Sequence, residues 1–223
     1  MKTTYRGPTT IEAIRCGDLT VRLARPTEPD RLLDDPEVTR LNRESDYMPY
    51  WAYLWPGAHL LASFVAGRAW PRGLAAIELG CGLGLAGLAG ALRGLRVTFT
   101  DYDDAPLDYV RRSAEANGLD PSLYATALVD WREPPADRFG LILAADVLYE
   151  RRLVPVVARA IAAILAPGGE ALVADPGRSS AEDFPRLLAE LGLEATTIPL
   201  ADDLPGHGPT RGTLYRATRP AGP

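Results

Sequence analysis

Residues 76–87 read AIELGCGLGLAG, and this stretch decides the fold of the chain. A short apolar run leads into closely spaced glycines, after which Leu85, Leu88 and Leu92 fall on one face of a helix. Glycine lets a chain turn sharply out of a strand, and without a Cβ atom the backbone can approach a ligand closely. A strand, a turn and a helix in this order place amide donors and a helix N-terminus beside the ligand. The stretch therefore predicts a nucleotide-type cofactor site.

The composition and charge exclude several classes of protein. With 223 residues, 47% of them apolar, the chain is long enough for one well-cored domain. A net charge of −5, with scattered arginines and Lys2 as the only lysine, gives no support for a nucleic-acid partner. Every apolar run is too short to cross a bilayer and no secretory signal opens the chain, so we expect no membrane association.

The cysteines and histidines bear on the compartment and on metal chemistry. Cys16 and Cys81 cannot form a disulfide framework, and Cys81 lies inside the glycine turn, so we expect a reducing, cytoplasmic environment. His59 and His207 are the only histidines, and no cysteine cluster accompanies them. We therefore expect no metal site.

Strand-like and helical runs alternate along the chain after the glycine turn. The strands are expected at residues 96–100, 124–129, 139–145, 170–174, 194–198 and 213–219, with a loop at 200–210. Helices of about ten to fifteen residues between the strands predict an α/β fold with a doubly wound, mostly parallel sheet. Ahead of the sheet, residues 10–15 and 19–23 predict a β-hairpin, and a charged connection with a short helix near 36–42 follows.

Acidic residues recur where the predicted strands end. In open α/β sheets, ligands bind outside the carboxyl ends of the strands, at the point where the strand order reverses. These ends are residues 78–84, 101–103, 130–131, 145–149 and 175–178. Carboxylates predominate among their polar side chains, so we expect an acidic pocket that favours a cationic ligand or one rich in hydroxyls and amines.

Two kinds of cofactor fit the glycine turn. Gly82-x-Gly84-x-x-Gly87 matches the dinucleotide fingerprint, and Asp101 follows about twenty residues on, where a ribose-binding acid is expected. Glu78 argues against NAD or FAD, because a pyrophosphate gains nothing from a facing carboxylate, whereas a sulfonium with an ammonium group gains Coulomb attraction. A sulfonium cofactor is therefore favoured, and an NAD-dependent oxidoreductase remains as an alternative.

The motifs also resemble those of a known family. ELGCGLG at residues 78–84 resembles the first motif of S-adenosylmethionine-dependent methyltransferases with a Rossmann-like, seven-stranded fold. The aromatic segment YWAYLWPG at 50–57 and the Asp-x-x-Tyr signature at 146–149 are similar to those of the protein-lysine methyltransferase group. Together with Asp-Pro-Gly-Arg at 175–178, the aromatic segment is most similar to the methyltransferase of the electron transfer flavoprotein β subunit and its bacterial relatives.

This resemblance has consequences for the fold, the domain organisation and the cofactor. It implies a Rossmann-like, seven-stranded sheet, mostly parallel, whose last strand is antiparallel. Residues 47–223 would form the methyltransferase domain, against which an N-terminal hairpin and connecting segment, residues 1–46, would pack. The cofactor would be S-adenosyl-L-methionine, the product would be S-adenosyl-L-homocysteine, and no metal would take part.

The resemblance also implies which residues contact the methionine part of the cofactor. Glu78 would lie near the methionine end, while Gly80, Gly82 and Gly84 allow close backbone approach. The backbone at Ala145 would bind the methionine ammonium.

A second set of residues is expected at the adenosine part. Asp101 would hold the ribose hydroxyls, because a carboxylate can accept from both, and Asp103 is a rival for this role. Tyr102 would flank the adenine. Asp130 would accept from the exocyclic amine, and the indole of Trp131 would lie against the ring.

The acceptor side of the site is expected around Asp146. Trp55 would lie beside the cofactor or over the mouth of the site. Asp146 and Tyr149, at i and i+3, would face one side of a turn, where Asp146 orients the incoming ammonium and Tyr149 shapes the acceptor channel. Neither needs to be a general base, because a lysine can lose its proton to water before it attacks. Arg178 would either pair with Asp175 or contact a protein substrate.

These expectations predict an S-adenosylmethionine-dependent N-methyltransferase that acts on lysine side chains of a protein, with the electron transfer flavoprotein β subunit as one candidate substrate. The same chemistry on a small amine or on a nicotinamide-type nitrogen is a first alternative. A non-catalytic S-adenosylmethionine-binding module is an alternative of another class.

Overall fold

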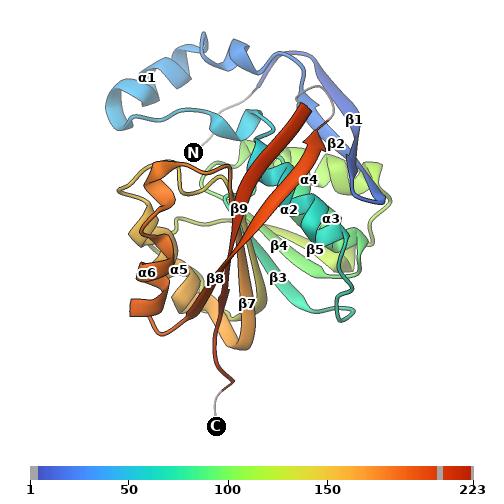
Figure 1. The fold of residues 1–223 in the computed structure, drawn as a ribbon. Helices are drawn as coiled ribbons and strands as arrows, with labels where there is room; N and C mark the ends of the chain where they lie inside the picture. The colour runs from blue at the N-terminus through green and yellow to red at the C-terminus, as the bar shows by residue number, and fades with distance from the viewer. Residues whose placement is uncertain (1–4, 205–207, 222–223) are drawn as a thin grey trace.

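A seven-stranded sheet forms the centre of the protein, which we describe from a computed structural model over residues 5–204 and 208–221. The strands are β3 (Ala75–Leu79), β4 (Arg96–Asp101), β5 (Tyr124–Leu128), β6 (Phe139–Ala145), β7 (Leu165–Asp175), β8 (Glu194–Leu204) and β9 (Gly208–Thr218). Their order in the sheet is β5-β4-β3-β6-β7-β9-β8. The strands from β5 to β7 are parallel, and β9 is antiparallel to both of its neighbours (Figure 1). The predicted sheet, mostly parallel with an antiparallel last strand, is confirmed.

Helices cover both faces of the sheet, as a doubly wound fold requires. One face carries α2 (Pro56–Ala66), α3 (Leu85–Leu92) and α4 (Ala105–Ala116). The other carries α5 (Val154–Ile164) and α6 (Phe184–Glu190). The apolar faces of these helices and the sheet between them form two hydrophobic clusters.

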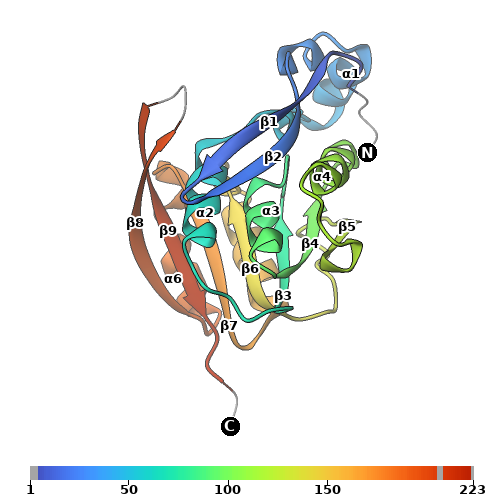
Figure 2. The ribbon, with the colours of Figure 1, turned by 90° about the vertical axis from the view of Figure 1, so that its right-hand side faces the viewer.

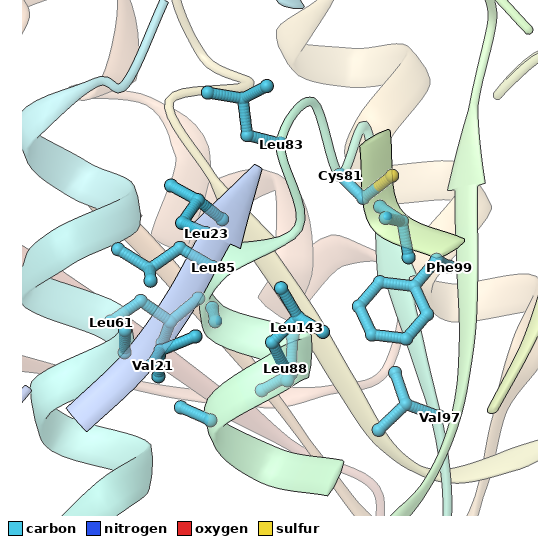
Figure 3. Packing of buried hydrophobic residues seen from close by; sticks show 14 of the residues in the cluster. Val21, Leu23, Leu61, Cys81, Leu83, Leu85, Leu88, Val97, Phe99 and Leu143 are labelled. Carbon is cyan, nitrogen blue, oxygen red and sulfur yellow. The ribbon is translucent and has the colours of Figure 1, made fainter. Parts of the chain in front are cut away.

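The central strands supply side chains to both clusters. In β6, Leu141 and Leu143 face α2, α3 and α4, whereas Ile142 and Ala144 face α5 and α6. Successive side chains of a strand point to opposite faces, so a strand covered on both sides is apolar throughout, as the sequence of β6 is. Figure 3 shows the first cluster, to which Leu143 and Leu88 of α3 belong.

An N-terminal hairpin, β1 (Thr9–Cys16) and β2 (Leu19–Pro26), confirms the predicted one. It lies across α2 and α3 and reaches α4 (Figure 2). Its inward side chains join the first hydrophobic cluster. On α4, Ser113 Oγ accepts a hydrogen bond from the Ala24 N–H at 2.9 Å, and both groups are buried. The hairpin is therefore held to the helices that cover this face of the sheet, by apolar burial and by a buried hydrogen bond.

The segment after the hairpin crosses the end of the sheet where the parallel strands terminate (Figure 1). It contains α1 (Pro36–Ser45), which continues past the short helix expected at 36–42. Asp35 caps this helix, and its side chain accepts a hydrogen bond from the Glu37 N–H at 2.8 Å. The helix ends at Asp46, which has a φ of 55°.

The loop expected at 200–210 is wrong over its whole described length, residues 200–204 and 208–210. β8 continues to Leu204 and β9 begins at Gly208, so the outer parts of the two strands pair with each other beyond the end of β7 (Figure 1). Backbone hydrogen bonds form this ladder, and turn-forming side chains do not prevent them. Pro199 is tolerated because β8 is the edge strand of the sheet. His207 lies outside the described residues.

Removing the hydroxyl of Ser113 tests how the hairpin is held. We expect Ser113→Ala to lower the free energy of unfolding by about 1–3 kcal/mol, because the buried Ala24 N–H loses its acceptor. Ser179→Ala, at an exposed serine, is the matched control and should change stability by less than about 0.5 kcal/mol. Urea unfolding of the three proteins measures the difference. Equal stability of both variants would contradict a stabilising role for this hydrogen bond.

Candidate active site

The carboxyl ends of the parallel strands meet at one edge of the sheet, and a cleft opens there beside the glycine turn. The strand order reverses at this place, because the chain adds β4 and β5 on one side of β3 and then β6 and β7 on the other. The cleft is lined by Tyr53, Leu54, Trp55, Ala58, Glu78, Gly80, Cys81, Gly82, Leu83, Gly84, Leu85 and Ala145. The predicted cofactor-binding residues among them are Trp55, Glu78, Gly80, Gly82, Gly84 and Ala145.

The three glycines of the turn all have positive φ angles, of 62°, 49° and 78° at Gly80, Gly82 and Gly84. A Cβ atom at Gly80 would lie 2.6 Å from Cζ2 of Trp131, and one at Gly84 would lie 2.7 Å from Cγ2 of Val110. Packing therefore requires glycine at both positions, in addition to the backbone conformation. Trp131 lies directly against the turn.

Asp101, the last residue of β4, ties this strand to the glycine turn. Its Oδ2 accepts a hydrogen bond from the Gly82 N–H at 2.9 Å, and its Oδ1 accepts one from the Asp103 N–H at 3.1 Å. Burial raises the pKa of Asp101 to about 6, although these amides oppose the rise. The carboxylate of Asp103 instead accepts from the Tyr47 hydroxyl and, at 3.3 Å, from the Ala105 N–H at the start of α4. The carboxylate of Asp101 thus ties β4 to the glycine turn.

Glu78 is buried under the same turn. Its Oε2 accepts a hydrogen bond from the Gly87 N–H in the first turn of α3, at 3.0 Å. A Cβ atom at Gly87 would lie 2.4 Å from this oxygen, which explains the last glycine of the stretch. Burial raises the pKa of Glu78 to about 8, and the charge of Asp101 adds to the rise. Two carboxyl groups with raised pKa values beside one cleft favour a cationic ligand.

The three residues predicted to contact the adenine lie in different surroundings. Tyr102 follows β4 and is 52% exposed. Asp130 Oδ1 accepts a hydrogen bond from the Arg132 N–H at 2.9 Å, and its Oδ2 lies 3.2 Å from the guanidinium of Arg132. The structure therefore brings Trp131 to Gly80 and pairs Asp130 with Arg132. Contacts of these side chains with an adenine stay predictions.

Asp146 follows β6 and meets the N-terminus of α2. Its φ of 58° lies in the left-handed region, which is uncommon outside glycine and costs conformational energy. Its N–H donates to the carbonyl of Ala174 at 3.0 Å, and its Oδ2 accepts from the Ala58 N–H at 3.2 Å. A Cβ atom at Gly57 would lie 2.4 Å from Oδ2. The carboxylate is thus held against the first turn of α2, where the helix dipole favours a negative charge.

Aromatic rings gather beside Trp55, which lines the cleft. The ring of Tyr50 lies edge-on to those of Tyr149 and Trp55, with centroid separations of 5.5 and 5.9 Å. Trp55 Nε1 donates to the carbonyl of Tyr50 at 2.8 Å. Tyr50 and Tyr149 are 42% and 39% exposed, so these rings form an accessible rim. Burial raises the pKa of Tyr149 to about 12, so its hydroxyl is neutral at ordinary pH.

Arg178 links the Asp-x-x-Tyr and Asp-Pro-Gly-Arg motifs. Its Nη1 lies 2.8 Å from Oδ1 of Asp146 and 2.9 Å from Oδ2 of Asp175. The pairing with Asp175 that the sequence left open is therefore present. Burial raises the pKa of Asp146 above its ordinary value, and the charge of Arg178 opposes that rise.

Sequence reasoning did not single out Tyr50, Gly57 or Ala58 as parts of the site. Gly57 carried a signal, because glycine disfavours a helix and its place in a first turn indicates close approach of another group. No sequence pattern shows that the N–H of Ala58 meets Asp146, 88 positions away.

The described part of the chain also bears on metal and membrane binding. Within residues 5–204 and 208–221, no group of three or more His, Cys, Asp or Glu side chains could hold a metal ion. None of the helices in the same ranges has the length and apolarity to span a membrane. Cys16 and Cys81 are buried free thiols.

The raised pKa of Glu78 predicts how stability depends on pH. An unfolded glutamate ionises near pH 4.5, whereas folded Glu78 ionises near pH 8, so its contribution to stability is lost as the pH rises between these values. Glu78→Gln keeps an acceptor for the Gly87 N–H but cannot ionise. We expect parent and variant to be similar at pH 5, and the variant to be increasingly more stable up to pH 8. Thermal unfolding from pH 5 to 9 measures this, and a constant difference across the range would contradict it.

The sequence is similar to those of curated lysine methyltransferases. The chain is 29% identical over 157 residues to the electron transfer flavoprotein beta subunit lysine methyltransferase of Xenopus laevis, covering 67% of this chain and 63% of that protein. It is 38% identical over 107 residues to the protein N-lysine methyltransferase METTL21A of Mus musculus, covering 44% and 48% of the two chains. The chain thus spans between about half and two thirds of these curated relatives.

A solved structure and a family profile complete the comparison. A putative RNA methyltransferase, PH1948 from Pyrococcus horikoshii, superposes with a TM-score of 0.61 at 13% identity and covers 83% of this chain and 98% of that one. At this identity, the likeness concerns the fold alone. The profile of the lysine methyltransferase family matches residues 50–188. Because that match covers more than half of the chain, the protein belongs to the lysine methyltransferase family.

Proposed function

We propose that the protein is an S-adenosyl-L-methionine-dependent methyltransferase that methylates a lysine side chain of a protein substrate. The observation that carries the proposal is the presence, at one sheet edge, of an acidic cleft beside the glycine turn and a second carboxylate, Asp146, near an aromatic rim. Membership of the lysine methyltransferase family supports it. A relative named for the electron transfer flavoprotein beta subunit makes that subunit one candidate substrate.

The residues of the cleft suit this cofactor, which carries a sulfonium and an ammonium group. Burial above all raises the pKa values of Glu78 and Asp101, and a bound cation favours the ionised form of both. The face of Trp131 suits the adenine, Asp101 the ribose, and the backbone of Ala145 the methionine ammonium. When bound, the cofactor supplies an activated methyl group. A pyrophosphate, as in NAD, would meet the same carboxylates with repulsion.

Asp146 binds and orients the lysine ammonium in this proposal. An unperturbed lysine has a pKa near about 10.4, so it must lose a proton before its nitrogen can attack the methyl group. Water at the accessible rim takes that proton, and Asp146 serves as an electrostatic anchor. Tyr50, Trp55 and Tyr149 align the aliphatic part of the lysine and limit access of water, which are the main contributions a protein makes to an in-line transfer.

The accessible rim favours a side chain presented on a protein surface. Sites for small ligands are usually concave and bury most of the ligand. Here Tyr50 and Tyr149 are both more than a third exposed.

We place the reaction in the cytoplasm, because the free thiols of Cys16 and Cys81 suit a reducing compartment.

Substitution of Asp146 tests the proposed anchor. We expect Asp146→Asn to reduce methyl transfer by at least about 100-fold, because the amide keeps the shape but lacks the charge that holds the ammonium. Asparagine tolerates the positive φ of this position, so the backbone should be retained. Affinity for S-adenosyl-L-homocysteine should stay within about threefold of the parent, since Asp146 does not line the cofactor cleft. Radiolabelled methyl transfer into a cell lysate and calorimetric titration measure the two quantities.

The labelling assay, together with cofactor binding and thermal stability measurements, separates the proposal from its alternatives. Label on a protein band, with methyl-lysine found by mass spectrometry, is the expected result. Label that travels with small molecules would replace the protein substrate by a small amine. If S-adenosyl-L-homocysteine binds but no label is transferred, the protein is a binding module. Thermal stabilisation by NAD alone would overturn the choice of cofactor.

A further inference from the structure

Two acidic residues and one arginine form a compact cluster beside the aromatic rim. Asp146 comes from the end of β6, Asp175 from the end of β7, and Arg178 from the segment after β7. Nη1 of Arg178 lies 2.8 Å from Asp146 and 2.9 Å from Asp175, so one guanidinium nitrogen serves two carboxylates. With both carboxylates ionised, the cluster has a net charge of −1.

The two carboxylates differ in how completely they are hydrogen-bonded. Asp175 is fully buried; its Oδ1 accepts from the N–H groups of Gly177 and Arg178 at 2.8 and 2.7 Å, and its Oδ2 accepts from the guanidinium. Oδ2 of Asp146 accepts from the Ala58 N–H. Oδ1 of Asp146 is buried and forms an ion pair with the guanidinium at 2.8 Å, but among the described residues no donor is aligned to give it a hydrogen bond of regular geometry.

This asymmetry distinguishes a structural carboxylate from one that can take a ligand. The ion pair with Arg178 offsets part of the cost of burying Oδ1 of Asp146, and a well-aligned donor from a ligand would remove more of it. Asp175 has its donors already, whereas Oδ1 of Asp146 retains the capacity for another. The excess charge of −1 matches one monovalent cation, such as a single lysine ammonium.

We propose that Arg178 is a positioning residue for the methyl acceptor. Its guanidinium is anchored by Asp175 and keeps the carboxyl group of Asp146 ionised. Oδ1 of Asp146 can then accept a hydrogen bond from the ammonium group of one substrate lysine. This role rests on the proposed function, in which Asp146 binds the lysine ammonium, and it assigns to Arg178 the control of the charge of Asp146. The groups that face Asp146 are Arg178, Asp175 and the Ala58 N–H of α2.

The proposal predicts a specific dependence on pH. Without the guanidinium, burial and the charge of Asp175 remain to raise the pKa of Asp146, so it becomes protonated at a higher pH and loses its hold on the ammonium. Loss of Arg178 should therefore reduce activity most at low pH, and the reduction should become smaller as the pH rises. A purely structural role for Arg178 would lower activity equally at every pH.

Arg178→Gln tests this, with Arg178→Lys as the conservative variant and Arg186→Gln as the matched control. Arg186 is an exposed arginine of α6 that pairs with Glu190. The assay measures initial rates of labelled methyl transfer to the acceptor band of a diluted lysate, so that the rate follows kcat/KM. We expect Arg178→Gln to fall at least about 10-fold below the parent at pH 7, and the deficit to shrink severalfold by pH 9. Arg178→Lys should retain more activity than Arg178→Gln, and Arg186→Gln should match the parent.

The controls separate failure of this inference from failure of the proposed function. Affinity for S-adenosyl-L-homocysteine should remain unchanged in all variants, which shows that each protein is folded and binds its cofactor. A deficit that is equal at pH 7, 8 and 9 would overturn the positioning role, as would full activity of Arg178→Gln at pH 7. Absence of transfer by the parent itself would instead refute the proposed function.

Discussion

The structure depends on the way acidic side chains at the carboxyl edge of the sheet are paired with backbone amides. Each of these carboxylates accepts an N–H from a neighbouring loop or helix start, and the acids concerned are Glu78, Asp101, Asp146 and Asp175. An ionised carboxylate with little water must find donors, so every such bond fixes a segment relative to a strand. The glycine turn, α2 and α3 are placed in this way.

Amide donors lower the free-energy cost of burying these acids but do not neutralise their charge. The two pairs of acids differ in how that charge is balanced. Asp146 and Asp175 share the guanidinium of Arg178. For Glu78 and Asp101 the pKa values are raised to about 8 and about 6, by burial above all. In the proposed function, a cationic cofactor would suit Glu78 and Asp101, and a cationic acceptor would suit the negative charge that Asp146 and Asp175 retain.

Much of the architecture follows from local pattern. Apolar periodicity and glycine positions predicted the hairpin, the alternation of strands and helices along the chain, and helices on both faces of the sheet. Burial against a sheet leaves a repeating apolar signal along the chain. The extended pairing of β8 and β9 was missed, since a backbone ladder at an edge needs no apolar signature. The predicted cleft residues Glu78 and Ala145 converge because parallel strands end at one edge, and Trp55 joins them from the start of α2.

The sequence alone determined the class of fold, the glycine turn and the acidic character of its surroundings, since these depend on residue type and short spacing. It could not determine which acid receives which donor. Contacts of Asp146 with Ala58 and Arg178 join segments that are distant along the chain, and only packing of α2 against the sheet brings them together. The glycine turn predicts where a cofactor binds, but the charge balance around Asp146, on which the proposed acceptor position depends, exists only in the folded protein.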